Sequence, residues 1–454
     1  MFESINPVTE TVFERVGLDD AETIDTRLEA ARRSFARWRS LTFAERADFI
    51  RAFARCLRDD REELGFLMTR EMGKPIAESR GEVDKAAWCF EHYADHAADY
   101  LADIDLESDA RHSYVQHLPL GTVFGILPWN SPLWLASRCA APALMAGNTV
   151  IIKPDSHLPG CTGALASRAR QTLPEGVLQF IHVDNDGAER VLRDSRVQAV
   201  SFTGSSKAGK IVGAIAGSEA KPAVLELGGS DPAIVLADAD LDAAAETIKT
   251  SRMINAGQSC IAAKRILVEE TVYDDFIGKM KGFLEALRMG DPEDPDTDIG
   301  PLARADLRDE LHRQVRASID AGARCVLGGE IPDRKGFFYP PTLLVDVPEN
   351  AAAFTQETFG PVAAVTPVKD AGHALALANH TAYGLAASIW TERQRGEALA
   401  AQLEAGQVAV NGLVKTDPRL PSGGIKSSGL GRELGPHGIR EFVNVQQVWV
   451  GPAR

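Results

Sequence analysis

Residues 121–154 read GTVFGILPWNSPLWLASRCAAPALMAGNTVIIKP. The stretch begins and ends with a short run of apolar and β-branched residues, and a segment of helical character separates the two runs. The runs VLQFIHV (177–183) and AVSFTG (199–204) continue this alternation. Strands that alternate with helices are typical of a parallel sheet with helices on its faces. We therefore expect an α/β fold.

A second alternation of the same kind begins after Glu226, so we expect a second α/β domain with a boundary near Gly228 or Gly229. The first hundred residues have apolar positions three and four apart, which predicts a layer of helices over 20–39, 43–60 and from Pro75 to about Tyr100. The expected strands of the second domain are PAIVLAD (232–238), KRILVEE (264–270), GPVAAVTPV (360–368), AASIW (386–390) and QVAVNG (407–412).

Two short segments fit neither sheet. Residues 111–118, RHSYVQHL, and residues 441–450, EFVNVQQVWV, alternate like half-buried strands. A strand at the margin of a domain needs a partner for its backbone groups. We therefore expect oligomer formation through these strands.

Length and composition limit the class of protein. A chain of 454 residues exceeds the size of one hydrophobic core, so we expect two or three domains. The net charge of -15 disfavours nucleic acid and anionic membranes as partners, because both are bound through clustered Lys and Arg. The N-terminus lacks a signal-peptide pattern, no apolar run is long enough for a membrane helix, and the six cysteines are scattered. These features predict a reduced, cytoplasmic protein.

A lone cysteine, Cys260, lies within MINAGQSCIAAKR, residues 253–265. Free cysteine is among the most buried residue types, so filling a core is one interpretation. A nucleophile is the other, because the preceding NAGQS is small and polar and leaves room for a ligand. The remaining cysteines lack such surroundings and are expected to be structural: Cys56, Cys89, Cys139, Cys161 and Cys325.

Other candidate residues are ambiguous by themselves. Glu226 ends an apolar strand, where a carboxylate is costly to bury unless it is used or paired, or else it points outward at an edge. Gly204 in SFTGSSKAG lies at a strand-to-helix turn that either binds a pyrophosphate or is structural. Lys153 ends the strand TVIIKP, where open α/β sheets bind ligands, or it is a surface lysine. His92 and His96 lie four apart without a third ligand, so we expect no metal site.

Seven motifs in sequence carry a family resemblance: PWNSP (128–132), IIKP (151–154), FTGSSKAG (202–209), LELGGSDP (225–232), GQSC (257–260), ETFGPV (357–362) and GGIKSSGLGRE (423–433). In this order they resemble the aldehyde dehydrogenase superfamily. The segments TREMGKP (69–75), LGGSDPAIVLADADL (227–241), AAKR (262–265) and LARADLRDELHRQV (302–315) resemble bacterial succinate semialdehyde dehydrogenases.

The resemblance implies a Rossmann-like cofactor domain, a second α/β catalytic domain and a small β oligomerisation element. It places the NAD(P)-binding domain at residues 1–110 and 121–228 and the catalytic domain at 229–433. The oligomerisation strands fall at 111–120 and 434–454, in a homodimer or homotetramer.

The resemblance also implies three catalytic residues. Cys260 attacks the aldehyde carbonyl as a thiolate. The side-chain amide of Asn130 and the backbone N–H of Cys260 hold the oxyanion. Hydride transfer to a nicotinamide leaves a thioester, and Glu226 activates the water that hydrolyses it. A position at an apolar strand end suits this role, since burial raises the pKa of a carboxylate toward that of a useful base.

NAD or NADP is the implied cofactor. In strictly NAD-dependent members, a glutamate three residues after the strand-end lysine binds the ribose hydroxyls and repels a 2′-phosphate. Ser156 occupies that position here, so we expect NADP to be accepted. The remaining implied contacts are Lys153 on the adenosine ribose, Gly204 and Ser205 near the pyrophosphate, Glu357 and Phe359 around the nicotinamide ribose, and backbone contacts from Trp129 and Leu227.

Arg138 matches an arginine that faces the substrate carboxylate in semialdehyde dehydrogenases, which implies succinate semialdehyde as substrate. The alternative is an ordinary arginine on a helix surface. A second carboxylate-binding arginine is replaced by Ile254, and an aromatic residue by Ser422, so aromatic or medium aliphatic aldehydes are the alternative substrates. Transfer of the thioester to coenzyme A is disfavoured by Glu226, and a catalytically silent binding protein by the presence of Cys260, Glu226 and Asn130.

Overall fold

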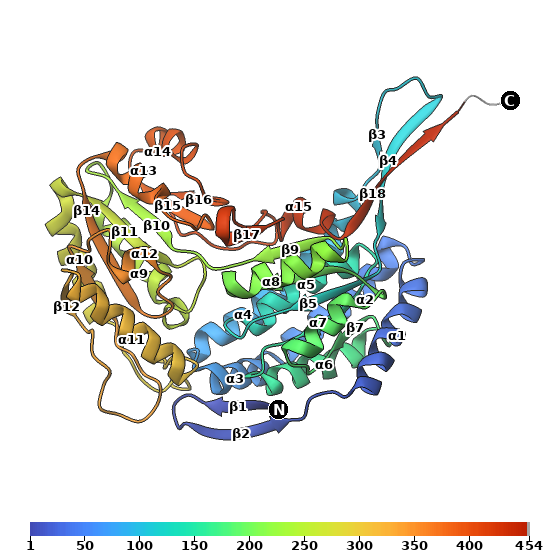
Figure 1. The fold of residues 1–454 in the computed structure, drawn as a ribbon, viewed down its shortest axis with the longest axis horizontal. Helices are drawn as coiled ribbons and strands as arrows, with labels where there is room; N and C mark the ends of the chain where they lie inside the picture. The colour runs from blue at the N-terminus through green and yellow to red at the C-terminus, as the bar shows by residue number, and fades with distance from the viewer. Residues whose placement is uncertain (452–454) are drawn as a thin grey trace.

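The computed structural model describes residues 1–451. Two open sheets, each covered by helices, form two lobes, and an antiparallel unit projects from one of them (Figure 1). The predicted α/β class is confirmed. The last parallel strand of the first sheet, β9, ends at Glu226, and the first strand of the second sheet begins at Asp231.

The first sheet has six strands in the order β17-β9-β8-β5-β6-β7. Residues 121–154 form β5, α5 and β6 as predicted, and β17 alone in this sheet runs antiparallel to its neighbour. Val123 and Phe124 are both fully buried and pack into different clusters, because successive side chains of a strand point to opposite faces. The strands are β5 (Thr122–Ile126), β6 (Thr149–Lys153), β7 (Leu178–Phe180), β8 (Val197–Thr203), β9 (Ala223–Glu226) and β17 (Gly429–Leu430).

Helices cover both faces of this sheet. The face that contains Phe124 packs against α1 (Ala21–Trp38), α7 (Asn185–Arg193) and α8 (Ser206–Ser218). The face that contains Val123 packs against α2 (Phe43–Asp59), α3 (Arg61–Met72), α4 (Ile76–Tyr100), α5 (Pro132–Met145) and α6 (Pro159–Thr172). Burial on both faces explains the continuous apolar character of the strands, and the predicted helical layer is confirmed over 21–38, 43–59 and 76–100.

The N-terminal residues depart from that helical layer. They form a hairpin of β1 (Phe2–Asn6) and β2 (Thr11–Val16), which the sequence pattern did not reveal. The hairpin packs on α3 and α6, so its strand conformation depends on the lobe beneath it.

The second sheet has seven strands in the order β12-β13-β14-β11-β10-β15-β16, and all five predicted strands belong to it. Its members are β10 (Asp231–Val235), β11 (Ala263–Glu269), β12 (Arg324–Leu327), β13 (Thr342–Val345), β14 (Val362–Val368), β15 (Ala386–Trp390) and β16 (Gln407–Val410). The helices of this lobe are α9 (Leu241–Met253), α10 (Tyr273–Glu285), α11 (Ala305–Asp320), α12 (Ala352–Thr355), α13 (Ala371–Asn379) and α14 (Arg393–Ala400), with 3-10 turns η1 (Ile254–Gly257) and η2 (Glu270–Val272).

The C-terminal segment returns to the first lobe through η3 (Lys426–Ser428), β17 and α15 (Gly435–Arg440). It ends in β18 (Val443–Val450), which pairs along its whole length with β4 (His112–Pro119); β3 (Ile104–Asp105) lies on the other side of β4. The two marginal strands therefore pair with each other, and β18 remains at the edge of the sheet (Figure 1). Residues 452–454 of the predicted oligomerisation segment lie outside the described residues.

None of the helices within residues 1–451 combines the length and the apolar character that a bilayer crossing requires.

Candidate active site

The candidate residues of the first lobe lie at one edge of its sheet. This is the edge formed by the carboxyl ends of the parallel strands, where open α/β sheets bind ligands. Trp129 and Asn130 follow β5, Lys153 ends β6, Gly204 and Ser205 follow β8, and Glu226 ends β9.

The segment before Cys260 has an unusual backbone. Asn255, Ala256 and Gly257 all have left-handed φ angles, of 54°, 51° and 75°. A Cβ at Gly257 would meet the carbonyl oxygen of Gly360 at 2.2 Å, so both the φ angle and the close approach require glycine there. Arg252, fully buried at the end of α9, donates to the carbonyl oxygens of Thr358 and Val362 and fixes this turn against the loop before β14.

Cys260 opens into a cavity of about 340 Å³ that lies between the two lobes. The cavity lining includes the polar Cys260 and Asn130, and apolar side chains such as Trp134 and Ile254. Its charged members are the cationic Lys74, Lys85, Arg138 and Lys415 and the acidic Glu78 and Glu82. Cys89, Cys139 and Cys161 are buried in the core of the first lobe instead, and all six cysteines are free. Tertiary structure thus separates Cys260 from the core cysteines.

Asn130 is held directly beside the nucleophile loop. The side-chain Nδ2 of Asn130 donates to the backbone carbonyl oxygen of Gln258 at 3.1 Å. The backbone carbonyl oxygen of Asn130 accepts from Asn255 Nδ2 at 2.8 Å. An amide nitrogen has two hydrogens, so one remains for a ligand in the cavity. This is the arrangement that an oxyanion-binding side chain needs.

Burial of the Cys260 side chain favours its protonated, neutral form. Burial raises its pKa to about 11, although the charges of Lys264 and Arg138 oppose this shift. A thiolate therefore requires a base or the approach of a further positive charge.

Glu226 is buried and paired rather than pointing outward at an edge. One of its oxygens, Oε2, accepts from Arg138 Nη2 at 3.1 Å, whereas Oε1 has no hydrogen-bond partner among the described residues. Burial raises the pKa of Glu226 to about 7, with a further contribution from the negative charge of Glu433, while Arg138 lowers it. Such a carboxylate exchanges protons near neutral pH, as a general base must.

Arg138 is not a helix-surface arginine: it is 3% exposed. Its Nη2 lies 3.1 Å from Glu226 and 2.5 Å from Glu433, and 3.4 Å from the hydroxyl of Ser422. Arg138 also lines the cavity, as a residue that contacts the substrate should. Its charge, however, is already compensated by the two buried carboxylates of Glu226 and Glu433.

The predicted residues for the adenosine end lie around the ends of β6 and β8. Lys153 and Ser156 are both half-buried, and the Ser205 hydroxyl caps α8 by accepting from the N–H of Ala208 at 3.3 Å. The carboxylate of Asp155, next to Ser156, is bound to His157 through both Nδ1 and the backbone N–H, at 2.6 and 3.0 Å. Its negative charge is therefore partly committed within its own loop.

The predicted nicotinamide-side residues join the two lobes. Phe359 packs edge-on against Trp129, with ring centroids 5.8 Å apart. Glu357 Oε1 accepts from the N–H of Gly229 at 3.1 Å, and the Leu227 N–H donates to the carbonyl oxygen of Ser428 at 3.0 Å.

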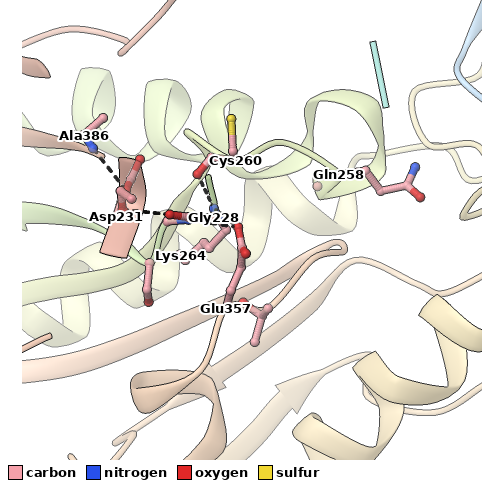
Figure 2. A network of polar contacts seen from close by, with 12 residues as sticks. Gly228, Asp231, Gln258, Cys260, Lys264, Glu357 and Ala386 are labelled. Carbon is pink, nitrogen blue, oxygen red and sulfur yellow. Dashed lines mark hydrogen bonds and ion pairs between the residues drawn. The ribbon is translucent and has the colours of Figure 1, made fainter. Parts of the chain in front are cut away.

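Lys264 is a residue whose importance the sequence did not reveal, although it lies in the AAKR segment. Its ammonium is fully buried, donates to the carbonyl oxygen of Cys260 and lies 3.4 Å from Glu357 Oε1. Figure 2 shows this network and the sulfur of Cys260 pointing away from it. Glu433, the last residue of GGIKSSGLGRE, and Lys85, on α4, were likewise missed because their partners are distant in sequence.

His92 and His96 pack together on α4, with ring centroids 4.6 Å apart, and His92 Nε2 lies 3.0 Å from the Tyr100 hydroxyl. Within residues 1–451, no group of three His, Cys, Asp or Glu side chains is arranged to hold a metal ion.

The sequence and the fold were compared with protein families, curated relatives and solved structures, and the matches extend over nearly the whole chain. The model of the aldehyde dehydrogenase family matches residues 1–448. The sequence is 46% identical to succinate-semialdehyde dehydrogenase [NADP(+)] 1 of Mycobacterium tuberculosis, over 98% of this chain and 99% of the relative. It is 43% identical to the succinate semialdehyde dehydrogenase [NAD(P)+] Sad of Escherichia coli, over 98% and 97%. The crystal structure of succinic semialdehyde dehydrogenase from Streptococcus pyogenes with NADP+ superposes with a TM-score of 0.97 at 32% identity, covering 100% of both chains.

Proposed function

This chain belongs to the aldehyde dehydrogenase family, and we propose that it oxidises succinate semialdehyde to succinate with NADP as hydride acceptor. The observation that carries the proposal is one cavity whose lining includes a cysteine, an amide and four cationic side chains against two glutamates. The cysteine and the amide suit an aldehyde, and the cations suit a substrate that also bears a carboxylate. The names of the relatives in Mycobacterium tuberculosis and Escherichia coli support the same substrate.

The covalent step begins at Cys260. Its thiolate attacks the aldehyde carbon, and the developing oxyanion is held by Asn130 Nδ2 and the backbone N–H of Cys260. When bound, NADP supplies the nicotinamide that accepts a hydride, which leaves the acyl group on the Cys260 sulfur as a thioester. Lys264 holds the Cys260 carbonyl oxygen and thereby orients the peptide that precedes Ile261.

Glu226 serves as the base. Its pKa of about 7 leaves a large ionised fraction at neutral pH, and Oε1, which has no hydrogen-bond partner among the described residues, is the oxygen that would accept the proton. Hydrolysis of the thioester then releases the acid. The presence of this carboxylate favours water over coenzyme A as the acceptor of the acyl group.

The residues at the end of β6 fit NADP. Lys153 forms no ion pair with a carboxylate of residues 1–451, and Ser156 presents a neutral hydroxyl where a glutamate would repel a 2′-phosphate. The carboxylate of Asp155, which is next to Ser156 in the sequence, lies 2.6 Å from Nδ1 of His157. These contacts support NADP as the preferred cofactor, with NAD as the alternative.

A substrate panel with both cofactors tests the proposal. Absorbance of the reduced cofactor is followed with succinate semialdehyde, butanal, benzaldehyde and octanal. We expect the highest kcat/KM for succinate semialdehyde with NADP. A preference for benzaldehyde or octanal would favour the alternative substrate class, for which the apolar lining of Trp134, Leu135 and the half-exposed Ile254 provides room.

We further propose a homodimer or homotetramer that forms through β18. This edge strand exposes Val445 by 61% and Trp449 by 48%, and unpaired backbone groups of an edge strand favour pairing with a second chain. A cytoplasmic location is supported by the six free cysteines.

A further inference from the structure

Four cationic side chains line the cavity: Lys74, Lys85, Arg138 and Lys415. Lys74 is paired with Glu82 and Lys415 is exposed, so Lys85 and Arg138 are the two to compare. Arg138 is paired with both Glu226 and Glu433. Lys85 forms no ion pair with any carboxylate of residues 1–451, although it is half-buried at the cavity wall. Withdrawing a cation from water, even partly, without a counter-ion is costly unless a ligand supplies the opposite charge.

We propose that Lys85, with Thr416, binds the distal carboxylate of the substrate and thereby selects semialdehyde acids over neutral aldehydes. This inference rests on the proposed function and names the residues that would make the enzyme specific for a carboxylate-bearing aldehyde.

The local geometry presents donors to an anion. Lys85 Nζ lies 4.2 Å from the centroid of the Trp134 ring, which holds the side chain in place by a cation–π contact. It donates to Thr416 Oγ1 at 3.0 Å, and Trp134 Nε1 donates to the same oxygen at 3.0 Å. A hydroxyl that accepts two hydrogen bonds has its own hydrogen left to donate, and an ammonium has two further hydrogens after one is used. Three donors thus remain for a carboxylate.

The titratable neighbours of Lys85 leave its charge uncompensated. Glu82, on the same helix, accepts from Lys74 and from the N–H groups of Leu133 and Trp134. Asp417, in the loop after β16, is bound by Arg419 through two hydrogen bonds of 2.9 and 2.6 Å.

The pKa of Lys85 reflects this environment. It falls to about 8, because burial and the charge of Arg138 outweigh Glu82, Cys89 and Asp417. A bound carboxylate would raise it again.

Arg138 is the less suitable partner for the substrate. A carboxylate placed on it would be the third around one guanidinium, next to the buried negative charge of Glu226 that must act as base. The binding energy would then be offset by repulsion at the reacting centre. Lys85 carries no such conflict.

Lys85→Met keeps the length of the side chain and removes its charge. We expect the KM for succinate semialdehyde to rise about 10- to 100-fold, the range for a lost charge-assisted hydrogen bond. The KM and kcat for butanal, which has the same four-carbon chain without a carboxylate, should stay within about threefold. Retained butanal oxidation also shows that the variant is folded. Lys85→Arg should restore part of the affinity for the semialdehyde.

Lys415→Met is the matched control, because Lys415 lines the same cavity but is exposed. We expect it to change the KM for the semialdehyde less than about threefold. Equal effects of the two variants, or equal losses of Lys85→Met on both aldehydes, would overturn the role of Lys85. An unmodified protein that oxidises butanal but not the semialdehyde would instead refute the proposed function, whichever residues line the cavity.

Discussion

The Arg138–Glu226–Glu433 cluster predicts how the rate of thioester hydrolysis depends on pH. Glu226 must be ionised to act as base, so the rate rises with pH through its pKa of about 7. Arg138 lowers this pKa and Glu433 raises it. Arg138→Met and Glu433→Gln should therefore shift the acid limb of the profile in opposite directions.

The magnitude follows from the contact between Arg138 and Glu226, at 3.1 Å. A hydrogen bond to a charged partner contributes ~1.5–3 kcal/mol, which corresponds to a rise of roughly one to two pKa units when Arg138 is replaced. At pH 7 the ionised fraction of Glu226 then falls from about one half to about 1–9%, so kcat falls roughly 5- to 50-fold and recovers at high pH. Glu433→Gln should move the limb to lower pH by up to about one unit.

The assay is kcat from pH 5.5 to 9.5 at saturating aldehyde and cofactor, with circular dichroism to verify folding of each variant. A pre-steady-state burst of reduced cofactor establishes that thioester hydrolysis limits kcat. The thiol of Cys260 offers a second explanation for Arg138→Met, since Arg138 also lowers the pKa of that thiol. The pre-steady-state burst separates the two, because it reports the steps up to the thioester at Cys260, whereas kcat reports its hydrolysis. Limbs that do not move, or that move in the same direction, would refute the assignment of Glu226 as the base tuned by this cluster.

Three further substitutions test the remaining parts of the site. Cys260→Ser removes the thiolate nucleophile and should lower kcat by at least ~10³-fold. The affinity for NADP, measured by fluorescence titration, should not change. Turnover near that of the unmodified protein would exclude Cys260 as the nucleophile. Asn130→Ala removes one oxyanion donor and should lower kcat about 10²- to 10³-fold in the same absorbance assay, whereas a change confined to KM would contradict that role. Ser156→Glu places a negative charge beside the 2′-phosphate and should raise the KM for NADP at least ~10-fold with little effect on NAD; equal effects on both cofactors would show that Ser156 does not face the 2′-phosphate.

The alternation of strands and helices was predictable because it is local. Residues 121–154 contain both the apolar runs and the helical segment between them, and they form β5, α5 and β6. The N-terminal hairpin β1–β2 was not predictable in this way, since its strands depend on packing against α3 and α6. The same holds for β17, whose two residues pair with β9 from a distance of about two hundred positions.

The sequence by itself determined the α/β class, the place of the candidate residues at strand ends and the set of residues to examine, because periodicity and turn residues act over a few positions. Tertiary structure alone decided the environment of each side chain. Cys260 and Cys89 are equivalent as isolated residues, yet one opens into the cavity and the other lies in a core. Arg138 meets Glu226 and Glu433 across 88 and 295 positions of the chain. This contact commits the charge of Arg138 and exists only once α5, β9 and the C-terminal segment have packed together. Electrostatic interactions depend on distance and burial in the folded protein, and neither quantity is encoded in the spacing of residues along the chain.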